Sequence, residues 1–99
     1  MSNSIWIHYS RPRPHWYLLT EAEQADLQER WAAVRESAKA AGGSTQGRFH
    51  IRGQHDFQEV EIWTFPQTTD AFNHWSKLVA ARYNEFFAFS NNIGLELPV

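Results

Sequence analysis

One stretch decides the fold, and it reads Glu59-Val60-Glu61-Ile62-Trp63-Thr64-Phe65, with a charged or aromatic residue at every second position. Alternation with a period of two is typical of a β-strand, whose successive side chains point to opposite faces of the sheet. Soon afterwards the segment Ala71-Phe72-Asn73-His74-Trp75 changes to helical spacing, so the strand leads into a helix. One face of the strand carries Glu and Trp and the other carries Val, Ile and Thr, and a small protein with a single sheet cannot bury both faces. We therefore expect the face with Glu and Trp to meet a second protein surface or a ligand.

The composition sets limits on the class of protein. The chain has 99 residues, of which 42% are hydrophobic, 15% aromatic and 20% charged, and these values predict a single globular domain, residues 1–99. The formal net charge of -2 offers no basic surface for nucleic acid. The sequence contains no cysteine, which excludes disulfides and thiolate chemistry. We find no apolar run of roughly 20 residues, the length that a membrane helix needs, and therefore expect a cytoplasmic protein.

Sequence signals divide the chain into six elements. Thr20 and Glu23 form a capping box at the start of a first helix, which ends at Gly42. Thr68 or Thr69 caps a second helix, which is expected to continue towards Asn91. The predicted strands cover residues 4–9, 47–52, 57–65 and 93–97.

The order strand, helix, strand, strand, helix, strand predicts a ferredoxin-like α+β fold, the split βαββαβ arrangement. In this fold a four-stranded antiparallel sheet carries both helices on one face. A turn at residues 53–56 would place Arg48 opposite Glu61 and His50 opposite Glu59, so that opposite charges fix the register. We expect this register to place the apolar side chains beneath the helices, namely Phe49, Ile51, Val60 and Ile62.

Residues 59–75, which join the third strand to the second helix, resemble the corresponding junction of antibiotic biosynthesis monooxygenase domains and of their haem-degrading relatives. The resemblance implies a dimeric α+β barrel, in which two such sheets pack face to face and each protomer keeps a pocket between its own sheet and helices. Where haem-degrading members carry a pocket tryptophan this chain has Pro66, and where they carry the haem-ligating histidine it has Glu85. The nearest substitute is His74, which we interpret as a solvated histidine at the helix edge, with haem ligation as the alternative.

The polar face of the sheet is the first candidate site. In a face-to-face dimer its residues would lie between the two sheets, and we assign to the interface Trp6, Arg48, Arg52 and Trp63. Two histidines and two glutamates on adjacent strands could instead transfer protons or hold a divalent metal ion. The candidates for proton transfer are His8, His50, Glu59 and Glu61.

The cleft between helices and sheet is the second candidate site. Arg82 falls within the apolar stripe of the second helix, so it must be paired, reach solvent or face a ligand anion. Tyr9 and Tyr83 could donate hydrogen bonds to an oxygen that gains charge during a reaction. The residues expected to bind a substrate are Tyr9, Trp31, Trp75, Arg82, Tyr83 and Phe86.

The sequence and the resemblance together predict a homodimer that binds a small apolar or aromatic molecule. The resemblance implies a monooxygenase, cyclase or isomerase that acts without a bound cofactor. The charge and the lack of a long apolar run predict neither nucleic acid nor a membrane as a partner. Two alternatives stay open at this point. One is a noncatalytic dimeric binding module, and the other is a haem- or metal-binding protein.

Overall fold

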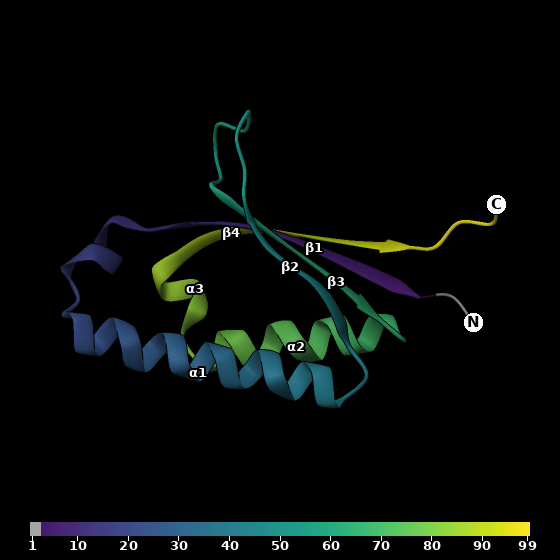
Figure 1. Cartoon of the computed structure of the whole chain (residues 1–99), viewed down its shortest axis with the longest axis horizontal. Helices are drawn as coiled ribbons and strands as arrows, with labels where there is room; N and C mark the ends of the chain where they lie inside the picture. The colour runs from purple at the N-terminus through teal and green to yellow at the C-terminus, as the bar shows by residue number, and fades with distance from the viewer. Residues whose placement is uncertain (1–2) are drawn as a thin grey trace.

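Four strands form one antiparallel sheet in the order β2-β3-β1-β4 in the computed structural model, which describes residues 3–99 (Figure 1). The strands are β1 (Ser4–Pro12), β2 (Ser44–His50), β3 (Glu59–Phe65) and β4 (Phe87–Leu95). The two outer strands pair only on one side, while β1 pairs with β3 and β4 along most of its length.

Two long helices, α1 (Glu21–Ala40) and α2 (Thr68–Ala80), lie side by side on one face of the sheet (Figure 1). Thr20 and Glu23 form the predicted capping box at the start of α1. Two shorter segments, η1 (Pro14–Leu18) and α3 (Tyr83–Phe86), connect the layers. The predicted ferredoxin-like α+β fold is therefore confirmed.

The predicted strand register is also confirmed. Arg48 lies opposite Glu61 and His50 opposite Glu59 in the pairing of β2 with β3. Between β1 and β3, His8 lies opposite Glu61. The polar and aromatic side chains of these three strands thus share one face of the sheet, as the alternation in the sequence predicts.

The prediction of which face the helices cover is wrong. Trp6 and Trp63 are each only 1% exposed because they lie beneath α1 and α2, and Glu61 is 5% exposed on the same side. The apolar residues of the other face are only partly buried and lie away from the helices; in β1 and β3 they are Ile5, Ile7, Tyr9, Val60 and Ile62. Trp6 and Trp63 are consequently not available to an interface between two sheets.

The second helix ends earlier than predicted. It stops at Ala80, and Arg82 adopts a left-handed conformation with φ of 70° before the short α3. Strand β4 begins at Phe87, six residues before the predicted position 93, since it pairs with β1 from Phe87 opposite Pro12 onwards. Long-range pairing with β1 therefore overrides the expected continuation of the helix over residues 87–91.

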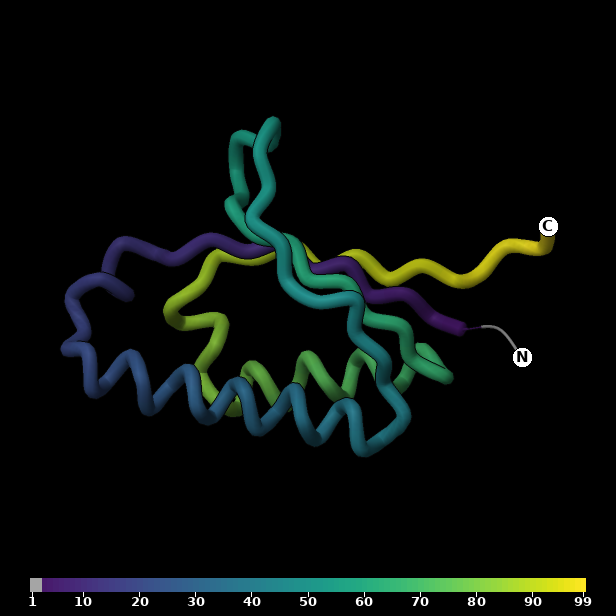
Figure 2. The backbone as a smooth tube through the Cα atoms, viewed as in Figure 1, coloured from purple at the N-terminus to yellow at the C-terminus, as the bar shows by residue number. Residues whose placement is uncertain are grey.

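The connection between β2 and β3 stands out from the sheet as an arm, residues 51–58 (Figure 2). The backbone N–H of Ile51 donates to the carbonyl oxygen of Gln58 at 2.8 Å and closes the base of the arm. Arg52 lies on this arm and is exposed. It therefore lies on neither face of the sheet.

Candidate functional site

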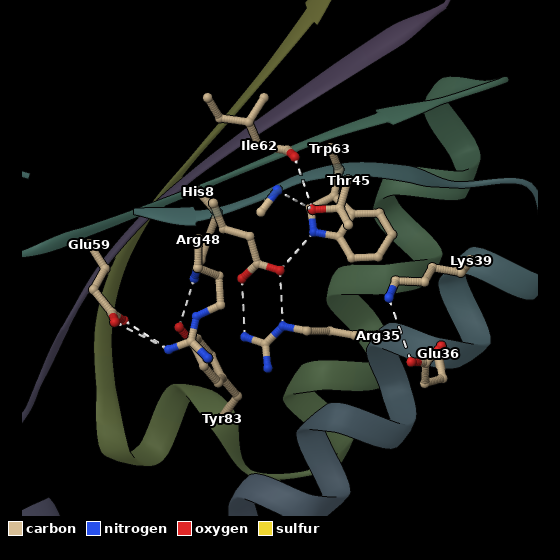
Figure 3. Close-up of polar contacts among 12 residues, drawn as sticks. His8, Arg35, Glu36, Lys39, Thr45, Arg48, Glu59, Ile62, Trp63 and Tyr83 are labelled. Atoms are coloured by element: carbon tan, nitrogen blue, oxygen red, sulfur yellow. Dashed lines mark hydrogen bonds and ion pairs between the residues drawn. The ribbon is translucent and has the colours of Figure 1, made fainter. Parts of the chain in front are cut away.

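A buried ion pair lies between α1 and the sheet. Glu61 accepts from Nε and Nη2 of Arg35 at 2.9 and 3.1 Å, and from Nε1 of Trp63 at 2.7 Å (Figure 3). Burial raises the pKa of a carboxyl group, but the hydrogen bonds and positive charge of Arg35, together with the hydrogen bond from Trp63, outweigh burial and hold the pKa of Glu61 below its usual value. Glu61 is thus a carboxylate whose two hydrogen bonds from Arg35 tie α1 to the sheet, while the third comes from Trp63 on its own strand.

Beside this ion pair, His8 joins two other side chains in a hydrogen-bonded row. Its Nδ1 lies 2.6 Å from Oδ1 of Asn91. Its Nε2 lies 2.9 Å from the hydroxyl of Tyr83 (Figure 3). An amide oxygen only accepts, so Nδ1 carries the proton and Nε2 accepts the phenolic proton of Tyr83. The row therefore runs from Asn91 through a neutral His8 to Tyr83.

The environment keeps both titratable members of the row uncharged. Burial lowers the pKa of His8, and the hydrogen bond to Asn91 and the charge of Glu61 oppose it only in part. Burial also raises the pKa of Tyr83 to about 12. At neutral pH, His8 is consequently a proton acceptor and Tyr83 a proton donor.

Aromatic rings surround the row and hold it in place. Trp6 stacks on His8 with ring centroids 4.8 Å apart, and Trp75 lies 6.0 Å from Tyr83. Trp31 packs edge-on against Tyr83, and its Nε1 donates to the carbonyl oxygen of Ala81 at 2.9 Å. These contacts exclude water from His8, which is 2% exposed.

A cavity of about 150 Å³ reaches Tyr83 from the side of α1 and β2. Its lining residues are Gln28, Trp31, Ala32, Arg35, Arg48, Tyr83 and Phe87. A second cavity, of about 180 Å³, has Arg35 and Arg48 in common with it. Gly47 lines this second cavity at a β-bulge, where its φ of 104° suits glycine and few other residues.

His74 differs from the prediction of a solvated histidine. It is 3% exposed, and neither ring nitrogen has a hydrogen-bond partner among the described residues. The rings of Trp6, Trp63 and Phe65 lie 5.1 to 5.8 Å from it. Burial lowers the pKa of His74 to about 4, so the imidazole is neutral at pH 7.

The structure brings several predicted site residues together at the cavity and the buried row. These are His8, Glu61, Trp31, Trp75, Tyr83 and Arg48. The orientation of the sheet, with its polar face beneath the helices, makes this possible. Arg48, assigned to the interface by the sequence, lines both cavities and forms an ion pair with Glu59 at 3.1 Å.

Other predicted site residues lie elsewhere. His50 is exposed at the end of β2, and Glu59 lies at the rim, where it is tied to Arg48. Tyr9 lies on the open face of the sheet, stacked on Phe57 at 6.0 Å.

Arg82 is exposed and paired with Glu85 at 2.7 Å, so the expectation that it faces the cleft is wrong. Phe86 packs against Trp16 at 5.8 Å, away from the cavity.

The sequence analysis did not identify two residues of the site, Arg35 and Asn91. Arg35 follows Trp31 by four residues and precedes Ala38 by three, so helical spacing already places it on the buried side of α1. Asn91 carries no such signal, because an Asn-Asn pair after a helical pattern is typical of a helix end. Its role depends on β4 pairing with β1, which brings Asn91 opposite His8.

Two further properties concern residues 3–99. No cluster of three or more His, Asp or Glu side chains in this part of the chain is arranged to hold a metal ion. Of the helices described, none combines the length and the apolar character needed to cross a membrane.

No protein-family model matches the chain, and no curated protein matches it either. The resemblance to antibiotic biosynthesis monooxygenase domains therefore stays a prediction. Solved structures do match. A mutant chlorite dismutase from Candidatus Nitrospira defluvii, in complex with cyanide, has a TM-score of 0.81 and 11% identity over 98% of this chain and 41% of that chain.

The chlorite dismutase of the same organism in complex with imidazole has a TM-score of 0.76 and 12% identity over 96% of this chain and 40% of that chain. This chain thus spans about two fifths of the length of the structures that it matches. At such low identity the likeness concerns the fold and not the chemistry. The comparisons show that the chain has the ferredoxin-like α+β fold found in chlorite dismutases.

Proposed function

We propose that this chain is one protomer of a homodimeric α+β barrel, and that it binds a small, largely apolar or aromatic molecule and transfers a proton without a bound cofactor. One observation supports this above all: the row Asn91, His8, Tyr83 ends on a side chain that lines the 150 Å³ cavity. A cavity of about this volume holds a molecule the size of benzene. The volume is below the several hundred Å³ typical of drug-sized ligands, so the substrate is small.

The row can move a proton in two linked steps. The oxygen of Tyr83 takes a proton from the bound molecule while its own phenolic proton passes to Nε2 of His8 over 2.9 Å. The imidazolium that forms is stabilised by the Asn91 oxygen on Nδ1 and by the negative charge of Glu61. Return of the proton to another atom of the molecule completes an isomerisation or cyclisation.

The roles proposed for the remaining polar residues follow from their positions. Glu61 holds Arg35 in place through its bidentate hydrogen bonds, and it acts on His8 through its charge. His50 and Glu59 lie at the rim and outside the row, so we give them no part in proton transfer.

Keto–enol exchange of phenylpyruvate tests this proposal, because the probe carries an aromatic ring and a mobile proton. We expect the protein to accelerate exchange, and Tyr83→Phe and His8→Gln each to reduce the rate by about 10²-fold or more. Tyr17→Phe is the matched control, since Tyr17 is 67% exposed and distant from the row. An equal rate in Tyr83→Phe and Tyr17→Phe would reject proton transfer by the row.

The proposed dimer uses the open face of the sheet in place of the polar face. Its central residues on β1 and β3 include Ile7 and Ile62, which pair directly and are only partly buried. An apolar centre of β-branched residues matches a second copy of itself across a two-fold axis.

Haem binding is the second candidate, because His74 is a buried neutral imidazole whose two nitrogens have no hydrogen-bond partner within residues 3–99. The surrounding residues do not fit a haem, however. Three aromatic rings pack around His74, and the cavity beside it measures about 80 Å³, far less than a porphyrin occupies. Titration with hemin, with His74→Ala as the control, tests this: a Soret band that depends on His74 would favour haem.

A further inference from the structure

Building on the proposed function, we infer that the ligand of the 150 Å³ cavity is a planar monoanion, a carboxylate attached to an aromatic or conjugated group. Arg35 and Arg48 bind the carboxylate, and the rings of Trp31, Tyr83 and Phe87 contact the flat remainder. The donor atoms, the charge and the shape of the cavity support this inference separately.

Hydrogen-bond donors are in excess at the cavity. Arg35 uses Nε and Nη2 to bind Glu61, and within residues 3–99 its Nη1 has no acceptor. Arg48 uses only Nη2, which binds both oxygens of Glu59, so its Nε and Nη1 are also unused by the described residues. Two guanidinium groups from α1 and β2 thus approach the same cavity with free N–H groups (Figure 3).

The charge of the lining favours an anion. Two arginines line the cavity, and neither Asp nor Glu is among the lining residues. The nearby carboxylate of Glu61 is already saturated by Arg35 and Trp63. A ligand carboxylate would therefore meet donors, and the cavity offers a ligand cation no carboxylate partner.

Arg48 is the arginine that can exchange its partner. Its ion pair with Glu59 is open to solvent, with side chains 51% and 34% exposed, and such pairs contribute little to stability. Arg35 is held by two hydrogen bonds to a buried carboxylate and is only 17% exposed. Arg35 accordingly provides a fixed positive charge, while Arg48 can leave Glu59 to form a bidentate contact with a carboxylate.

Three aromatic rings give the cavity its shape. Tyr83 and Phe87 are stacked nearly parallel, at 9° and 5.1 Å, and Trp31 stands almost perpendicular to both. This corner presents both ring faces and ring edges to a ligand, an arrangement that suits another flat ring. With the volume of about 150 Å³, it accommodates one ring and one small anionic group.

Comparison of benzoate with neutral benzamide tests the inference, since the two probes have nearly the same shape and differ in charge. Quenching of tryptophan fluorescence reports binding next to Trp31, and calorimetry provides an independent measurement. We expect benzoate to bind at least about tenfold more tightly than benzamide, with a preference that weakens as salt is added. Arg48→Gln should abolish the preference, Arg48→Lys should retain part of it, and Arg52→Gln on the exposed arm should leave it unchanged.

Equal affinity for benzoate and benzamide would overturn the inference and leave proton transfer by the Tyr83 row intact. Equal behaviour of Arg48→Gln and Arg52→Gln would overturn the role of Arg48 in the same way. Binding of benzoate without any exchange of phenylpyruvate would instead reject the proposed function and retain the anion site. If neither benzoate nor benzamide binds, the inference is overturned, and the exchange of phenylpyruvate alone decides on the proposed function.

Discussion

The two faces of the sheet differ in the side chains that they carry and in how completely these side chains are buried. The face beneath the helices carries indoles, an imidazole and a carboxylate, and the buried His8 and Glu61 both find hydrogen-bond partners there. The open face carries β-branched residues such as Ile5 and Ile7 that remain partly exposed. The helices of this chain therefore cover the face of the sheet whose polar groups receive hydrogen bonds from α1 and α3. They do not cover the face whose strand residues are the more apolar.

Removing one member of the buried ion pair should have the largest effect on stability. In Glu61→Gln the guanidinium of Arg35 stays buried without its counter-charge, which costs about 3–5 kcal/mol in the free energy of unfolding. Glu59→Gln is the matched control on the same strand, because its pair with Arg48 is exposed and should cost less than about 1 kcal/mol. Urea denaturation measures both, and similar losses in the two variants would contradict the contrast between them.

His74 should make stability depend on pH. Its pKa falls from 6.5 to about 4 on folding, so between these values the unfolded chain binds a proton that the folded chain excludes. Stability is therefore fully present above pH 6.5 and is lost as the pH falls towards 4, by about 3 kcal/mol in total.

His74→Leu removes this dependence while filling a similar volume among Trp6, Trp63 and Phe65. Glu61 and His8 lose stability in the same direction on acidification, since the pKa of each is lowered by folding. The diagnostic quantity is thus the difference between the wild type and His74→Leu, measured by urea denaturation at pH 7 and pH 4.5. A difference that does not change with pH would show that His74 is not buried in a neutral form.

The contrast between the two faces also explains which parts of the structure the sequence could predict. The strand β3 and its register with β2 depend on alternation and on charges in two consecutive strands, both of which are visible in the sequence. The choice of covered face depends on Arg35, which reaches Glu61 from another element. Spacing from Trp31 is compatible with Arg35 on the buried side of α1, but only the assembled layers show what it binds.

The candidate site was predictable to a similar extent. His8 and Glu61 were identified because alternation places them beside tryptophans on one face. The row through Asn91 could not be predicted, since it requires β4 to begin at Phe87 and to pair along the full length of β1. Local helical signals in residues 83–91 concealed that strand.

The smallest effect on unfolding is expected on the open face, where Phe49 is 48% exposed. Phe49→Ser should change the stability of the isolated protomer by less than about 1 kcal/mol, because the ring is only half-buried there. In the proposed dimer the same ring is buried against the second copy, so the variant should weaken dimerisation at least about tenfold.

Phe72→Ser is the matched control, since Phe72 is 56% exposed but lies on α2, on the opposite side of the molecule. Sedimentation across a range of concentrations separates the two sites: equal dissociation of both variants, or a stable monomer in the wild type, would mean that the open face does not bind a second copy.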